Sequence, residues 1–223
     1  MNNKTKRCVK LSLLLLSFFL YSFATAQEEV KAYKEAIRLK PDDAQAHYNL
    51  GAAYDRLGRY QEAIEAYKKA IRLKPDFAEA HCNIGAAYDR LGRNQEAIEA
   101  YKQAIRLKPD FAEAHCNLGV AYGKLGRYQE AVEACKQAIR LKPDFAEAHC
   151  SLGQAYAGLG RYQEAVEACK QAIRLKPDFA MAHFGMGISY LLLGDKGSAL
   201  EEYKILKNLD KDKANQLFNL IYK

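Results

Sequence analysis

Histidine and cysteine stand side by side three times in this sequence, which makes them the first residues to examine for chemistry. The pairs His81-Cys82, His115-Cys116 and His149-Cys150 recur every 34 residues. Imidazole and thiolate are ligands that zinc prefers in proteins. Adjacent residues on a helix point about 100° apart, so a histidine and the cysteine beside it do not easily share one metal ion. We therefore predict no metal site, and a thiol- or metal-handling protein remains only a lesser alternative.

The patterns that usually carry catalysis are missing from the sequence. It has no glycine-rich phosphate loop, no G-x-S-x-G and no H-E-x-x-H. All five histidines occupy one slot of a repeat, which is more typical of packing than of a catalytic set. We predict no enzymatic activity, no catalytic residue, no cofactor and no small-molecule substrate.

A period of 34 residues organises most of the chain. The five prolines follow it, and they are Pro41, Pro75, Pro109, Pro143 and Pro177. A fixed period of this size is typical of stacked supersecondary units. Counting from Ala44, the units are 44–77, 78–111, 112–145, 146–179 and 180–213. Positions within a unit are called places 1 to 34 below.

Each unit predicts two helices and no strand, because no segment alternates polar and apolar residues with period two. In the second unit, Pro75 ends the preceding helix, and Asp76 with Glu79 three residues later predicts a capping box for the next. The first helix is expected to end at Leu91-Gly92, where glycine suits a left-handed cap. The fold class is therefore all-α.

The unit resembles the tetratricopeptide repeat. Leucine or isoleucine at place 7 precedes glycine at place 8 in the first four units, as in Leu50-Gly51. Tyrosine fills place 11, alanine fills place 20, and proline fills place 32 in four units. The resemblance implies a right-handed solenoid whose inner groove binds proteins. Histidine at place 4 and cysteine at place 24 of two units depart from the usual pattern.

The N-terminus has the order of a secretory signal peptide. Residues 1–10 carry four basic side chains, residues 11–23 are almost wholly apolar, and Ala24-Thr25-Ala26 forms an A-x-A site. Thirteen helical residues span about 20 Å, short of the roughly 30 Å of a bilayer core. We predict cleavage after Ala26 and export to the periplasm or the extracellular space. Membrane contact is expected only through an uncleaved signal.

Removal of residues 1–26 changes the charge of the chain. The formal net charge falls from +7 to +3, because four basic residues and no acidic residue leave. A nearly balanced charge argues against nucleic acid as a partner. Residues 27–43 then form an N-terminal capping half-repeat, and residues 214–223 a C-terminal capping helix. An odd number of cysteines, five, is left, and we expect most to be free thiols.

We predict that the binding surface is the face of each first helix that carries places 2, 5, 9, 12 and 13. It lies opposite the packing face of places 4, 7, 8 and 11, and it changes from charged in the first units to apolar in the fifth. The candidate groove residues are Tyr48, Asp55, Arg56, Cys82, Asp89, Arg90, Cys116, Val120, Lys124, Cys150, Gln154, Met181, Phe184, Ile188, Leu191 and Leu192.

The sequence therefore favours an interaction scaffold that holds a segment of another protein in this groove. By analogy with exported relatives, an adaptor in an envelope or secretion assembly is the first hypothesis. The alternative is a structural solenoid that self-associates through the apolar face of its fifth unit.

Overall fold

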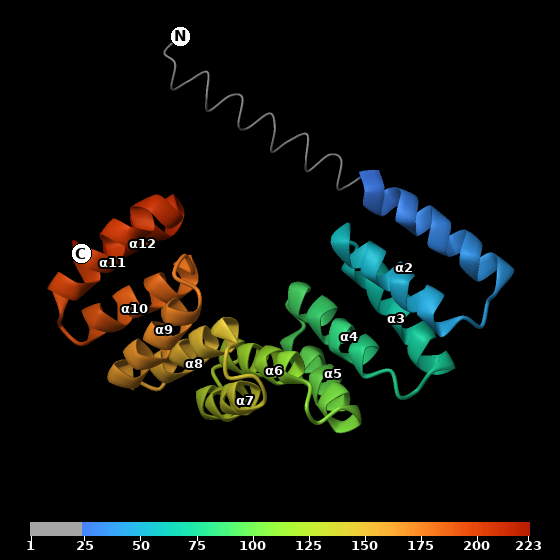
Figure 1. The fold of residues 1–223 in the computed structure, drawn as a ribbon, viewed down its shortest axis with the longest axis horizontal. Coiled ribbons are helices and arrows are strands. Elements are labelled where there is room, and N and C mark those ends of the chain that lie inside the picture. Colours follow the sequence, from blue (N-terminus) through green and yellow to red (C-terminus); the bar gives the residue numbers. More distant parts are fainter. Residues whose placement is uncertain (1–23) are drawn as a thin grey trace, which may run out of the picture. The chain divides into compact units, whose positions relative to one another are not determined.

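The computed structural model describes residues 24–223, and every regular element in that part of the chain is a helix, which confirms the all-α prediction (Figure 1). The chain divides into two compact units, residues 1–93 and residues 94–223. The predicted signal segment lies mostly outside the described residues. Within residues 24–223, no helix is both long and apolar enough to cross a membrane.

The first compact unit contains four described helices. The first covers residues 24–39 and includes the predicted cleavage point after Ala26. It is followed by α2 (Ala44–Arg56), α3 (Tyr60–Leu73) and α4 (Ala78–Arg90). Ile64 and Tyr67 of α3 are almost completely buried, so they form the centre of this unit's core.

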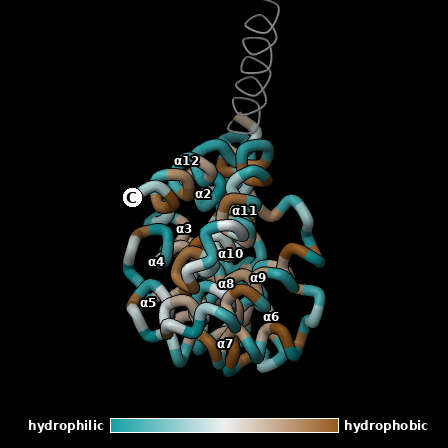
Figure 2. Tube along the Cα trace, turned by 90° about the vertical axis from the view of Figure 1, so that its left-hand side faces the viewer, coloured by the Kyte–Doolittle hydropathy of each residue, from teal (hydrophilic) through white to brown (hydrophobic). Residues whose placement is uncertain are grey.

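The second compact unit contains eight helices. They are α5 (Asn94–Leu107), α6 (Ala112–Lys124), α7 (Tyr128–Leu141), α8 (Ala146–Gly158), α9 (Tyr162–Leu175), α10 (Ala180–Leu192), α11 (Lys196–Leu209) and α12 (Lys211–Ile221). Hydrophilic and hydrophobic stretches alternate along the chain, as expected for amphipathic helices (Figure 2). Val132 and Val166 on α7 and α9 are fully buried and form part of the core.

Glycine ends the first helix of each hairpin, as the sequence predicts. Gly58, Gly92, Gly126, Gly160 and Gly194 have φ between 70° and 82°, and no other residue of the described chain has positive φ. A side chain is strained in this left-handed region, so glycine lets the chain turn sharply into the second helix.

The predicted capping box is wrong for α4. Phe77, not Asp76, stands at the N-cap, and it makes no side-chain hydrogen bond to the helix. Its ring is buried and stacks on Tyr48 with 4.7 Å between ring centroids, so packing fixes this helix start. Phenylalanine takes the same place before α6, α8 and α10. Among these first helices only α2 has an aspartate there, and Asp43 caps it by accepting from the amides of Gln45 and Ala46.

The C-terminal helix, α12, begins before the predicted capping helix 214–223 and ends at Ile221. It begins at Lys211 because the carboxylate of Asp210 caps the amides of Asp212 and Lys213. Leu217 and Ile221 of α12 are buried in a cluster with Leu206 and Ala199 of α11. The helix therefore covers the end of the fifth repeat.

Candidate functional site

The predicted groove residues of the second compact unit lie on α6, α8 and α10. Lys124, Gln154, Met181 and Leu192 are exposed, and Val120 is half-buried. They share one face because places 2, 9 and 13 fall on the same side of a helix with 3.6 residues per turn.

Two adjacent hollows occupy this face, and they share Gln154. The first has a volume of about 260 Å³ and is lined by Val120, Lys124 and Tyr128 among others. The second has a volume of about 240 Å³, and Met181, Phe184 and Ile188 form its apolar part. The surface can therefore hold apolar side chains beside one amide and one cation.

Small residues open the first hollow. A β-carbon added at Gly123 would meet nothing within 4 Å, whereas the same place carries aspartate in the first two repeats, at Asp55 and Asp89. A β-carbon at Gly158 would lie 2.4 Å from the ring of Tyr128, so this tyrosine packs directly on the α8 backbone. The lack of side chains at these two glycines shapes the hollow and its wall.

The three cysteines at place 5 are not open to a partner, which corrects the prediction for Cys82, Cys116 and Cys150. They are 5%, 4% and 3% exposed. Cys116 packs between Ala138 of its own hairpin and Ala148 of the next. Place 5 thus points toward the neighbouring hairpin, at the edge of the predicted face.

The buried thiols are poorly suited to metal or redox chemistry. Burial raises the pKa of Cys116 to about 11 and that of Cys150 to about 12, because the thiolate loses its hydration. Cys116, Cys135, Cys150 and Cys169 are free thiols. Residues 24–223 contain no group of three or more His, Cys, Asp or Glu side chains placed to hold a metal ion.

The apolar face of the fifth repeat is covered only in part. Phe184, Ile188 and Leu191 pack against the cluster that α12 completes. Met181 and Leu192 stay 39% and 53% exposed. The part of this face next to Gln154 therefore remains open.

The first compact unit has a polar counterpart of this face. The amide of Asn83 donates to the hydroxyl of Tyr48 at 3.0 Å and to that of Tyr67 at 3.4 Å. Burial raises the pKa of Tyr48, and the bond from Asn83 opposes the shift. Sequence reasoning missed Asn83, because asparagine is common at place 6 and nothing in the sequence shows that it reaches two tyrosines.

The charged candidates of the first unit are also placed by the structure. Asp55 and Asp89 are half-buried, while Arg56 and Arg90 are exposed. Burial raises the pKa of Asp55, and the Arg90 guanidinium opposes this increase. These two acidic and two basic side chains therefore give this face a mixed charge.

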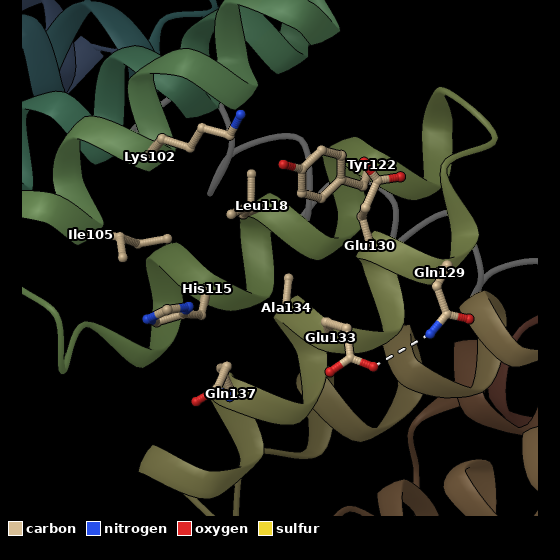
Figure 3. A pocket seen from close by; sticks show the side chains of 10 residues that line it. All are labelled: Lys102, Ile105, His115, Leu118, Tyr122, Gln129, Glu130, Glu133, Ala134 and Gln137. Atoms are coloured by element: carbon tan, nitrogen blue, oxygen red, sulfur yellow. Dashed lines mark hydrogen bonds between the residues drawn. The ribbon is translucent and has the colours of Figure 1, made fainter.

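A second groove lies on the other side of α6, where the sequence predicted only packing. It has a volume of about 380 Å³ and lies over His115, Leu118 and Tyr122, between side chains of α5 and α7 (Figure 3). Leu118 and Tyr122 are buried, but His115 is half-buried. Two residues of α5 and five of α7 complete the lining, and they are Lys102, Ile105, Gln129, Glu130, Glu133, Ala134 and Gln137.

Comparison with known proteins identifies the repeat. A family model described as TPR repeat matches residues 30–58, 56–92 and 90–126, and one described as tetratricopeptide repeat matches residues 112–145 and 146–179. No curated protein matches the chain.

Solved structures give the same result. The crystal structure of MamA is 31% identical, covers 74% of this chain and 97% of its own, and superposes with a TM-score of 0.65. A thermophilic TPR protein of Thermus thermophilus, TTC0263, is 26% identical, with coverage of 81% and 100% and a TM-score of 0.67. YrrB, a TPR protein with an unusual peptide-binding site, is 22% identical, with coverage of 85% and 99% and a TM-score of 0.66. The chain folds as an all-α solenoid of helical hairpins, and it belongs to the tetratricopeptide repeat family.

Proposed function

We propose that this protein, whose repeats make it a scaffold for protein–protein interaction, binds a segment of another protein on the face of α6, α8 and α10. The observation that carries the proposal is the pair of hollows that share Gln154. Six predicted groove residues line them, and these are Val120, Lys124, Gln154, Met181, Phe184 and Ile188. We propose no catalytic role.

The chemistry of the two hollows sets the segment that would fit. Met181, Phe184 and Ile188 offer apolar contact to one or two aliphatic or aromatic side chains. The amide of Gln154 can donate to and accept from a peptide backbone. Lys124, which lines the first hollow, favours an acidic residue of the segment.

The test begins with peptides selected from a random library on the purified protein. Their affinities are then measured by calorimetry for Gly123→Leu and Met181→Glu. Gly123→Leu fills the first hollow where a β-carbon meets no neighbour, so the variant should fold normally and lose binding at least tenfold. Arg174→Leu, an exposed change on α9 outside both proposed sites, is the matched control and should bind like the wild type.

Unchanged affinity in both groove variants would refute this site. Tight self-association of the wild type in sedimentation experiments, with no peptide selected, would instead favour the structural alternative. Exposed Leu192 is the observation that favours that alternative.

We also propose that the protein is exported and acts in an envelope or secretion assembly. The proposal depends on the signal-like order of residues 1–26. Mass spectrometry of the protein from fractionated cells should find a mature form that begins at Gln27. An intact N-terminus in the cytoplasmic fraction would contradict export.

A further inference from the structure

The histidine at place 4 has a different environment in the fifth repeat than in the third. His115 and His183 both place Nε2 within 3.0 Å of a proline carbonyl, that of Pro109 and Pro177 respectively. A carbonyl only accepts, so Nε2 carries a proton in both rings. In the fifth repeat, Nδ1 also has a partner, because it lies 2.7 Å from Oε2 of Glu202.

One substitution between the repeats accounts for this difference. Place 23 is glutamate in the fifth repeat and alanine in the others, at Ala66, Ala100, Ala134 and Ala168. In the fifth repeat, Glu202 and His183 are only 7% and 4% exposed. In the third repeat, Ala134 and His115 instead line the open groove of about 380 Å³. In the fifth repeat, the carboxylate of Glu202 thus occupies the position beside the histidine. In the third repeat, the same position is open.

The surroundings of His115 can accept an acidic side chain. Ile105, Leu118 and Ala134 provide apolar contact for the methylene groups. The charged groups on the groove are Lys102, Glu130 and Glu133. Lys102 comes within 3.8 Å of Glu99, Glu130 is paired with Arg127, and Glu133 accepts a hydrogen bond from Gln129. Arg127 thus compensates the charge of Glu130, and Lys102 adds a positive charge to the lining. The amide of Gln129 satisfies one oxygen of Glu133 without neutralising its charge.

The fourth repeat carries the same set of residue types. All ten lining residues recur 34 positions later in the same order, from Lys136 through His149 and Ala168 to Gln171. His149 also places Nε2 3.0 Å from a proline carbonyl, that of Pro143. The same ligand chemistry is therefore expected twice, one repeat apart.

We propose that the groove over His115 binds a glutamate side chain of a partner polypeptide, with its carboxylate at Nδ1 of His115 and its methylene groups on Leu118 and Ala134. His149 serves a second glutamate of the same partner. This site lies on the opposite face of α6 from the hollows of the proposed peptide-binding surface, and it does not depend on that function.

The test follows the histidine ring signals of the whole protein by NMR while N-acetyl-glutamate-N′-methylamide is added. The pH is about 7.5, roughly one unit above the usual pKa of imidazole. Signals are assigned with single His→Gln variants. The ring signals of His115 and His149 should move saturably toward their protonated positions. Those of His183 should stay unchanged, because Glu202 already occupies its site. The uncharged analogue N-acetyl-glutamine-N′-methylamide should have no such effect.

Two variants separate this site from non-specific anion binding. Ala134→Glu should shift the His115 signals toward the protonated form without any ligand and abolish its response, while Ala134→Gln should block the response without that shift. Glu202→Ala should make His183 responsive. The Gly123→Leu variant, which alters the face of α6, α8 and α10, should leave all of these results unchanged, so the two proposals fail independently.

Three results would overturn the proposal. One is a His115 signal that does not move up to the solubility limit of the compound. Another is an equal movement of His183 in the wild-type protein. The third is an equal effect of acetate, which lacks the additional methylene groups and would reveal a site for any small anion.

Discussion

The imidazole of His183 bridges a buried carboxylate and a backbone carbonyl, with Glu202 at 2.7 Å from Nδ1. The proline carbonyl lies 2.9 Å from Nε2. Both ring nitrogens thus face acceptors, and the charged imidazolium suits this position best. The hydrogen bond to Glu202 raises the pKa of His183 above its usual value, although burial opposes the shift.

This arrangement predicts that stability depends on pH. A raised folded pKa stabilises the protein fully below the unfolded value of about 6.5, and the stabilisation is lost as pH rises through the folded pKa. Glu202→Gln should remove this dependence. Each pKa unit by which the folded value exceeds the unfolded value contributes about 1.4 kcal/mol to the free energy of unfolding. Thermal unfolding of both proteins at pH 5.5 and pH 8.5 measures it. Parallel curves for the two proteins would contradict the charged pair.

Replacing two glycines of α6 by alanine, one at a time, should change the stability of the protein in opposite directions. A β-carbon at Gly119 would lie 2.5 Å from Sγ of Cys135 and 3.2 Å from the carbonyl of Ala131. Gly119→Ala should therefore destabilise the protein by about 1–3 kcal/mol. Gly123→Ala meets no neighbour and should stabilise it by about 0.5–1 kcal/mol. Urea denaturation followed by circular dichroism compares them, and equal effects would mean that α6 and α7 are not in close contact.

Helix capping should differ between the first and second repeats. Asp43 accepts from two amides of α2, so Asp43→Ala should cost about 1 kcal/mol. Asp76→Ala serves as the matched control and should change stability by less than about 0.5 kcal/mol, since Phe77 holds the N-cap of α4. The free energies of unfolding in urea decide between them. A larger loss of stability for Asp76→Ala than for Asp43→Ala would support the capping box that the sequence predicts.

The C-terminal helix should stabilise the fifth repeat through one of its leucines. Leu217 is fully buried against α10 and α11, whereas Leu220 is 46% exposed. Leu217→Ala should destabilise the protein by about 2–5 kcal/mol, and Leu220→Ala by less than about 0.5 kcal/mol. Hydrogen exchange should place the loss in α10 to α12. Similar costs at both positions would mean that α12 is seated differently.

The sequence alone predicts the helices well because the repeat supplies five copies of each signal. Glycine after leucine ends every first helix, and its conformation depends only on local backbone geometry. The helix starts are harder to predict. Asp76 and Glu79 have capping-box spacing, but the stacking of Phe77 on Tyr48 is a tertiary contact that the local pattern does not contain.

The candidate site is predicted in part for a similar reason. Helical spacing places Val120 and Gln154 on one face, and both line its hollows. The position of Cys116 depends on how closely one hairpin packs on the next, so its burial does not follow from spacing within one helix. The groove over His115 could not be predicted from the sequence either. Its walls come from three helices, and the distances between these helices do not follow from the local pattern.

The distribution of cysteines gives the protein an internal reporter of motion. Residues 44–77 and 180–213 contain none, whereas Cys135 and Cys169 are fully buried in the central hairpins. A buried thiol reacts with an alkylating reagent only when the structure around it opens. The rate of labelling at each cysteine therefore measures how often the packing around that thiol opens, without any engineered label.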